Sequence, residues 1–384
     1  MKVLARLVTA GLGAAVVAGS VLATAGAASA AGAAPASGWP GAGRAVFVQT
    51  DNLAGNQVVA YRRAGDGTLS LAGTYATGGL GGQLAGSVVD HLASQGSLGY
   101  DASRGLLYAV NAGSDTVSVF AVAGDRLALR QVIGSGGEFP VSVAVHGDLV
   151  YVLNAEGGGS VHGYRVAFGR LIPIPGSTRA LGLNPDATPQ FTNTPGQAAF
   201  SPDGRQLIVT TKANGSDIDV FGVRANGELS SEPTVNADPG AVPFAIAFDP
   251  AGHVVIADAG SNALSTFALG PNGALTALDT VGTGQSATCW VAADGGLLFA
   301  SNAGSADVSG YASGNGGTLT LLSQTATDPG TVDAAVTPGG GFVYVQTGGN
   351  GVVDEFAVSS AGSLTEVGHV TVAGAAGGEG IVAP

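Results

Sequence analysis

Short apolar strands that end in an aromatic residue dominate the pattern of hydrophobic and polar positions along the chain. Runs rich in Val, Ile, Leu and aromatic residues are bounded by Gly, Asn, Asp and Pro, which is typical of β-strands. Subtracting the numbers of the recurring aromatic residues gives spacings of 59, 44, 57, 46, 44 and 45 residues. A repeat of this length, built from short strands, predicts the blades of a β-propeller. The aromatic residues are Tyr61, Phe120, Tyr164, Phe221, Phe267, Tyr311 and Phe356.

Seven repeats predict an all-β fold, a seven-bladed β-propeller of four-stranded antiparallel blades, with almost no helix because no helical periodicity is sustained. The two longer spacings correspond to two insertions, Ala76–Ser94 and Ile172–Thr194. The first clear strand, Ala45–Thr50, matches the second strand of a repeat, whereas the last segment, Gly377–Pro384, matches an opening strand. We therefore expect the C-terminal strand to join the N-terminal blade and close the ring.

The N-terminus has the pattern of a secretory signal peptide. Lys2 and Arg6 precede an apolar run over residues 7–25, and Ala28-Ser29-Ala30 offers a small-x-small cleavage site. The alternative is an N-terminal membrane anchor, although the run is rich in Gly and Ala. We expect residues 1–30 to be a signal peptide, 31–43 a flexible Ala/Gly/Pro lead-in and 44–384 one propeller domain. The mature protein is then secreted, extracellular and free of the membrane.

Charge and composition exclude several classes of function. The formal net charge is −13, and removing a signal that carries two basic residues and no acidic residue leaves −13 − 2 = −15. Such a chain is unsuited to nucleic acid, because binding there depends on Lys and Arg. Cys289 is the only cysteine, so no intrachain disulfide can form. We find no metal-ligand spacing and no nucleotide-binding loop, and we expect a monomer without a cofactor.

Candidate site residues come from the strands and loops expected around the axis. Aligning the seven opening strands places a polar but almost uncharged ring near the mouth of the channel, with Asp333 as its one carboxylate and with Ser142 and Gln197 among its members. Glu379 lies in the closing strand and His91 in the first insertion. Loops on a rigid scaffold commonly carry binding groups. We place Glu138, Arg179 and Lys212 on the same face as both insertions.

The blade sequences resemble those of the lactonase-family seven-bladed propellers. The likeness is carried by LLYAVNAGSDTVSVFAV at Leu106–Val122, FVYVQTGGNGVVDEFAV at Phe342–Val358, and the SPDG and DPAG turns at Ser201–Gly204 and Asp249–Gly252. That family includes 6-phosphogluconolactonase and fungal carboxymuconate-cyclising enzymes, so the resemblance implies a propeller fold and a lactonase activity. Family enzymes place His, Arg and acidic residues around the channel mouth. Here the corresponding segments, such as that beginning at Thr194, contain no His.

Two functions follow as hypotheses. The first is a lactonase-like hydrolase of a small, non-phosphorylated lactone at the mouth of the axial channel. Asp333 or Glu379 would activate water as a general base, with His91 as a further catalytic candidate. Arg179, Lys212 or Gln197 would polarise the carbonyl, and Ser142 and Glu138 would contact substrate. The second is a non-catalytic extracellular scaffold that binds a protein, glycan or small ligand. Both acids also have a structural alternative: Asp333 would accept hydrogen bonds from backbone amides of the neighbouring inner strand, and Glu379 would help to hold the closing strand in place.

Overall fold

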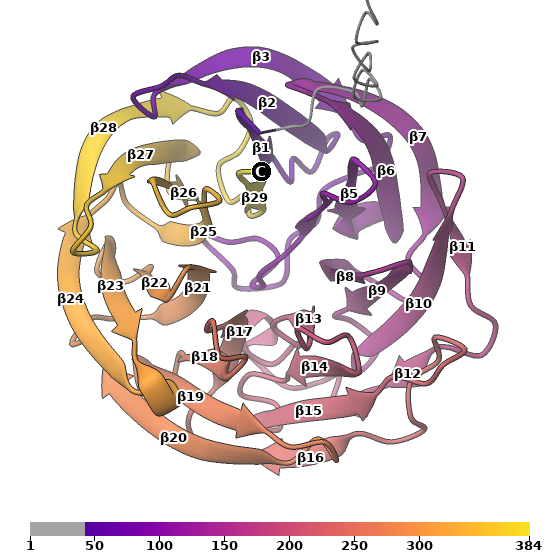
Figure 1. Ribbon diagram of the computed structural model, residues 1–384. Helices are drawn as coiled ribbons and strands as arrows, with labels where there is room; N and C mark the ends of the chain where they lie inside the picture. The colour runs from indigo at the N-terminus through magenta and orange to yellow at the C-terminus, as the bar shows by residue number, and fades with distance from the viewer. Residues whose placement is uncertain (1–42) are drawn as a thin grey trace, which may run out of the picture. The chain divides into compact units, whose positions relative to one another are not determined.

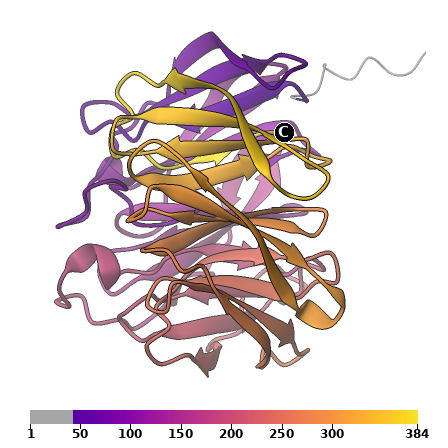
Figure 2. The same ribbon diagram turned by 90° about the vertical axis from the view of Figure 1, so that its left-hand side faces the viewer.

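Seven antiparallel sheets stand around a common axis in the computed structural model, which describes residues 43–384. The predicted signal peptide and nearly all of the predicted lead-in lie outside the described residues. Figure 1 shows the ring along its axis and Figure 2 shows it from the side, with neighbouring sheets packed face to face around the circle. The predicted all-β, seven-bladed propeller is therefore confirmed.

Each sheet forms one blade, numbered here from the sheet that holds the first strand. Blade 1 contains β29 (Ile381–Val382), β1 (Ala45–Gln49), β2 (Gln57–Arg63) and β3 (Leu69–Ala76). Blade 2 contains β4 (Leu98–Asp101), β5 (Leu106–Asn111), β6 (Thr116–Ala123) and β7 (Arg126–Gly134). Blade 3 contains β8 (Pro140–His146), β9 (Leu149–Asn154), β10 (Ser160–Ala167), β11 (Arg170–Pro173) and β12 (Arg179–Ala180).

The remaining four blades each contain four strands in chain order. Blade 4 contains β13 (Ala198–Phe200), β14 (Gln206–Thr210), β15 (Asp217–Gly222) and β16 (Thr234–Ala237), and blade 5 contains β17 (Pro243–Phe248), β18 (Val254–Asp258), β19 (Ala263–Leu269) and β20 (Leu275–Gly282). Blade 6 contains β21 (Thr288–Asp294), β22 (Leu297–Asn302), β23 (Asp307–Ser313) and β24 (Leu319–Ala326). Blade 7 contains β25 (Thr331–Val336), β26 (Phe342–Thr347), β27 (Val352–Val358) and β28 (Leu364–Thr371).

The repeated aromatic residues all lie on the third strand of a blade, where they pack between neighbouring sheets. Tyr164, for example, is fully buried in the core, and its ring is surrounded by apolar side chains of the adjacent strands. Tyrosines on the second strands also link blades. The Tyr151 hydroxyl donates to the Gly227 carbonyl oxygen at 2.7 Å, and the Tyr344 hydroxyl donates to that of Gly67 at 2.6 Å. Apolar burial and these bonds hold adjacent blades together.

The C-terminal strand closes the ring as predicted. In blade 1, β29 pairs antiparallel with β1, so that Val382 faces Phe47 and Ile381 faces Val48. The inner edge of blade 1 is thus supplied by the end of the chain, while its other strands come from the beginning. Closure removes an open sheet edge that could otherwise pair with other chains.

Helix is confined to three single-turn 3₁₀ segments among the described residues: η1 (Ala112–Ser114), η2 (Gln190–Thr192) and η3 (Asn315–Gly317). The longest of these covers one turn, and within residues 43–384 no helix has the length and apolar character needed to cross a membrane.

Candidate functional site

The first insertion folds back over the axis, so the predicted channel mouth is covered. We call residues 84–96 the axial loop. The loop bonds to several blades in turn: the His91 amide donates to the Gly377 carbonyl oxygen at 2.8 Å, and the Ser94 hydroxyl donates to that of Val141 at 2.9 Å. The Trp290 indole N–H donates to the Ser94 carbonyl oxygen at 2.6 Å. The loop therefore spans from the C-terminal segment to blades 3 and 6.

Gln95, near the end of the axial loop, bonds to two blades. Its amide Nε2 donates to the Val291 carbonyl oxygen at 2.8 Å, and its Oε1 accepts from the Val291 amide at 2.9 Å. The Gln95 backbone amide also donates to the Gly196 carbonyl oxygen in blade 4 at 3.2 Å. The Gln95 side chain thus lies across the centre of the ring. Figure 1 shows the axial loop, just before β4, at the centre of the ring of blades.

The sequence of the insertion explains its path. Leu84 and Leu92 are fully buried in the core shared by blades 2 to 4, so the loop contributes apolar anchors of its own. Glycine permits the close approach that this requires: a Cβ on Gly81 would lie 2.0 Å from the Asp51 carbonyl oxygen. The apolar anchors and the glycine together hold the loop inside the ring.

Asp333 and Glu379 meet beneath the axial loop. The two carboxyl groups share a side-chain hydrogen bond. Glu379 Oε1 accepts from the Gly96 amide at 2.9 Å, and Asp333 Oδ2 accepts from the Ile381 amide at 3.3 Å. Only 4 % of Asp333 and none of Glu379 is exposed, so neither can touch a solute while the loop is in place.

Burial makes these acids hard to ionise. It raises the pKa of Asp333 to about 7, against hydrogen bonds from Ile381 and Ala334 that lower it. The pKa of Glu379 is raised well above its ordinary value, first by burial and then by the charges of Asp333 and Asp90. Burial also raises the pKa of Asp90 to about 6, although loop amides and Lys212 oppose this. The pair therefore holds protons near neutral pH and acts as a donor as well as an acceptor.

Lys212 fastens the two insertions to each other. Its Nζ donates to the carbonyl oxygens of Ala93 and Phe191, both at 2.6 Å, and to Thr194 Oγ1 at 3.1 Å. The side chain is 1 % exposed and lies 5.2 Å from the centre of the Phe244 ring. Burial lowers the pKa of Lys212 to about 7, and the charge of Asp90 partly opposes that shift. All three hydrogen-bond acceptors are neutral groups of the protein, so the three N–H donors of the Lys212 ammonium group are already used within the fold.

We predict that this buried cluster gives the free energy of unfolding a minimum near pH 7. Asp333, Glu379 and Asp90 keep protons that they lose in the unfolded chain above about pH 4, so stability falls as pH rises from about 4 to 7. Lys212 loses its proton earlier in the folded state, so stability rises again above pH 7. Urea unfolding at pH 5, 7 and 9 should show a drop of about 2–4 kcal/mol between pH 5 and 7.

The matched variant for this test is Glu379→Gln, which has the same shape and no titration. It should flatten the fall between pH 5 and 7. A Glu379→Gln profile that kept the full fall would contradict an origin in the buried acids.

The side chains of Ser142, Gln197 and His91, three further predicted residues, bond to or pack against other parts of the protein, whereas that of Glu138 is exposed. Ser142 is fully buried, and its Oγ accepts from the Ala198 amide at 3.3 Å. Gln197 Oε1 accepts from the Ile246 amide at 2.6 Å. The ring of His91 lies against Gly377, where an added Cβ would be 2.1 Å from His91 Nε2, and burial lowers the pKa of the imidazole. Glu138 is exposed, and its carbonyl oxygen accepts from the Glu156 amide at 3.2 Å.

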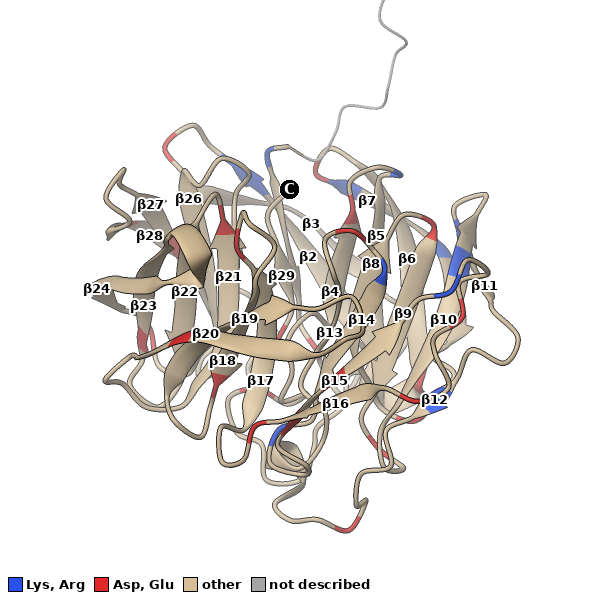
Figure 3. Ribbon diagram, turned by 60° about the horizontal axis from the view of Figure 1, so that its bottom comes forward, with Lys and Arg blue, Asp and Glu red and all other residues tan. Residues whose placement is uncertain are grey.

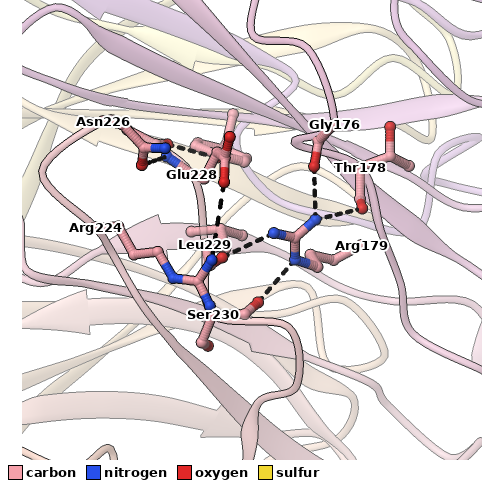
Figure 4. A network of polar contacts seen from close by, with 10 residues as sticks. Gly176, Thr178, Arg179, Arg224, Asn226, Glu228, Leu229 and Ser230 are labelled. Carbon is pink, nitrogen blue, oxygen red and sulfur yellow. Dashed lines mark hydrogen bonds and ion pairs between the residues drawn. The ribbon is translucent and has the colours of Figure 1, made fainter.

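Arg179 lies at the outer side of blade 3, on the strand that pairs beyond β10, and the structure does not bring it to the carboxyl pair. Figure 4 shows its guanidinium between two turns. Nε donates to the Ser230 carbonyl oxygen at 2.7 Å and Nη2 to that of Leu229 at 2.8 Å, while Nη1 donates to the carbonyl oxygens of Gly176 and Thr178. With four carbonyl partners, Arg179 ties blade 3 to blade 4.

The structure reveals a polar pocket that the sequence did not indicate, where the second insertion meets the β9–β10 turn. Its volume is about 130 Å³. We call it the insertion pocket. Gln190 links its parts: Nε2 donates to Glu156 Oε1 at 2.9 Å, and Oε1 accepts from the Ala85 amide at 2.7 Å. Its polar lining residues are Glu156, Asn184, Gln190, Asn193, Thr194 and Asn214.

Glycine shapes the wall of the insertion pocket. Gly157, Gly158 and Gly159 all have positive φ, between 65° and 87°. A Cβ on Gly158 would lie 2.8 Å from the Leu183 carbonyl oxygen, so the second insertion can pack directly on this turn only because glycine is present. At the equivalent turns after Asn111, Asp258 and Asn302 the chain reads Ala-Gly, whereas here it reads Ala155-Glu156. A glutamate at a position where these three other repeats have glycine was the feature of the sequence that could have indicated this pocket.

Charge is sparse on the ring, as Figure 3 shows. Among the residues that line the insertion pocket, Glu156 is the one ionisable group and none is Lys or Arg. Within residues 43–384, no group of three or more His, Cys, Asp or Glu side chains is arranged to hold a metal ion. Cys289 is a free thiol whose pKa burial raises to about 12, so it is protonated and a poor nucleophile at neutral pH.

Comparisons with known proteins agree with the fold. Residues 84–257 match a family model described as "Lactonase, 7-bladed beta-propeller". A periplasmic gluconolactonase of Pseudomonas aeruginosa is similar in structure, with 19% identity, a TM-score of 0.68, and coverage of 88% of this chain and 98% of that one. A Bacteroides fragilis protein provisionally assigned as a 6-phosphogluconolactonase gives 21% identity, a TM-score of 0.68, and coverage of 86% and 96%. No curated protein sequence matches the chain.

Proposed function

We propose that this chain, which resembles the lactonase-family seven-bladed propellers, is an exported lactonase-like hydrolase of a small, uncharged lactone. The family match supports the reaction class, and the insertion pocket supports the location. The observation on which the location rests is that one carboxylate, Glu156, lies in a polar hollow of about 130 Å³ on the face that carries both insertions. Export rests on the N-terminal sequence alone.

In lactone hydrolysis, water adds to the ring carbonyl and the ring C–O bond breaks, which gives a hydroxy acid. Glu156 is suited to take the proton from that water, since its Oε1 is oriented by the Gln190 amide at 2.9 Å. Thr194 is suited to stabilise the oxygen that becomes negative. Its Oγ accepts from Lys212 Nζ at 3.1 Å, which leaves the hydroxyl proton free to be donated into the pocket. Lys212 thus acts through Thr194 rather than on the substrate.

The charge of the pocket restricts the substrate. With Glu156 and no basic residue in the lining, a phosphorylated or carboxylated lactone would meet like charge without a cation to offset it. Neutral polyhydroxy lactones can instead hydrogen-bond to the side chains of Asn184, Asn193 and Asn214. The proposal is therefore for neutral rings of about the size of an aldonolactone.

The test is acid release from a panel of lactones by mature protein, measured in a pH-stat with spontaneous hydrolysis subtracted. We expect turnover of neutral lactones such as glucono-δ-lactone and little turnover of phosphorylated ones. Glu156→Gln should lower kcat by about 10²-fold or more, as expected for loss of a general base. Retained turnover in Glu156→Gln together with its loss in Asp333→Asn would transfer the role to the buried carboxyl pair and refute the insertion pocket as the active site.

A second function, ligand binding without catalysis, is favoured by the cover over the axis and by the hydrogen bonds that already occupy Lys212 and Arg179. In that case calorimetry would detect a neutral sugar or lactone in the insertion pocket, whereas the pH-stat would show no turnover above background. Asn214→Asp would then weaken binding, while Glu156→Gln would have a small effect.

A further inference from the structure

The axis contains a second cavity, on the face opposite the insertions. Its volume is about 500 Å³. It is formed by the opening strands of blades 1, 2, 5, 6 and 7, and Phe248, Val336 and Pro384, at or beyond the C-terminal ends of three of these strands, contribute to it. Because both insertions precede opening strands, the C-terminal ends of those strands point to the other face. We call this space the axial cavity.

Gln95 ends the axial cavity on its inner side. The side-chain amide is held across the ring by both hydrogen bonds to Val291. The cavity is a wide depression that is open to one face, and the polar carboxyl cluster lies beyond Gln95, in contact with Ser94 and Gly96.

The chemistry of the cavity walls is apolar. Apart from Gln95 and Tyr100, the lining consists of Ala, Val, Ile, Phe and Pro, and no charged side chain takes part. Both polar atoms of the Gln95 amide are already bonded to Val291. Apolar side chains dominate the lining, so an apolar solute that covers them gains free energy by removing apolar surface from water.

We propose that the axial cavity is a second ligand site, which binds one small, uncharged and largely apolar molecule. The volume of about 500 Å³ lies within the range of small-molecule sites, about 300–1,000 Å³, which fits one compact ligand. The lining side chains carry no charge, so they offer no partner to an anion or a cation that would lose its hydration here. This site is separate from the insertion pocket and does not depend on the proposed hydrolase activity.

The experiment uses the neutral fluorophore N-phenyl-1-naphthylamine, titrated into the mature protein. We expect saturable binding of one molecule per chain, with enhanced fluorescence. Ala335→Trp fills the axial wall, and Ala293→Trp fills the cavity from a partly exposed position on blade 6. Each should weaken binding by roughly tenfold or more. Ala361→Trp, at an exposed turn, is the matched control and should leave binding unchanged.

Each variant is first checked for a cooperative melting transition, and Ala293→Trp is included because a partly exposed position tolerates a large side chain best. A sulfonated analogue of the fluorophore should bind at least tenfold more weakly. The proposal is overturned by absence of binding to the unmodified protein, or by undiminished binding in a folded Ala335→Trp or Ala293→Trp variant.

Discussion

Deleting Gly377–Pro384 is expected to prevent the protein from forming a stable ring. The deletion removes β29 and with it the pairing of Ile381 and Val382 to β1. It also removes the Glu379 carboxylate that accepts from the Gly96 amide, and the Gly377 carbonyl oxygen that accepts from the His91 amide. Because the same eight residues hold both the inner edge of blade 1 and the axial loop, their loss acts on two parts of the fold at once.

The expected measurement is loss of the cooperative thermal transition, or a midpoint lowered by at least ~15 °C, together with aggregation through the exposed edge of β1. The control is a synthetic peptide of sequence Gly377–Pro384 added to the truncated protein during refolding. Strand addition should restore part of the stability. A truncated protein that melts at the parent temperature would falsify closure by the C-terminal strand as a stabilising element.

Replacing Lys212 with Met is expected to cause the largest loss of stability of any single substitution discussed. The variant leaves the carbonyl oxygens of Ala93 and Phe191 and the Thr194 hydroxyl without their donor, around a side chain that is only 1 % exposed. It also leaves Asp90 without its cation. Losing one partner of a buried polar network costs about 2–4 kcal/mol.

Urea unfolding measures this loss, and limited chymotrypsin digestion locates it. Cleavage after Phe191 and near Leu92 should become faster in Lys212→Met, because the two insertions are no longer joined. Arg165→Met is the matched control, since Arg165 forms a partly exposed ion pair with Asp148 and should contribute less than 1 kcal/mol. Equal stability of the two variants would show that Lys212 does not hold the insertions together.

The architecture could be predicted from the sequence because each blade repeats the same short pattern of strand and turn residues. The aromatic residues on the third strands and the match of Gly377–Pro384 to an opening strand were enough to predict the blades and their closure. The opening strands of blades 1, 2 and 4 are shorter than those of the other four blades. Gly96 donates to the Glu379 side chain, Gly378 donates to the Ala375 carbonyl oxygen, and the Gly196 carbonyl oxygen accepts from the Gln95 amide. The bonds of Gly96 and Gly196 depend on the long-range path of the first insertion.

The candidate site was harder to predict, because residue type does not reveal which partners a side chain finds. Lys212 and Arg179 were expected to meet a substrate, yet both donate to carbonyl oxygens of the protein. Leu84 and Leu92, in a glycine-rich insertion, were the available sign that this segment is buried. Glu156 was overlooked because a carboxylate in a hairpin turn usually faces solvent, and its Gln190 partner lies 34 residues away.

Chemical-shift mapping with a stable lactone analogue decides most directly whether the insertion pocket is where this protein meets its ligand. Glucono-δ-lactam, which resists hydrolysis, would be titrated into ¹⁵N-labelled mature protein. Saturable amide shifts at Gly157, Gly158, Asn193 and Asn214 are the expected result. Shifts confined to residues of the axial cavity such as Ala335, or none at saturating lactam, would show that the ligand site lies elsewhere.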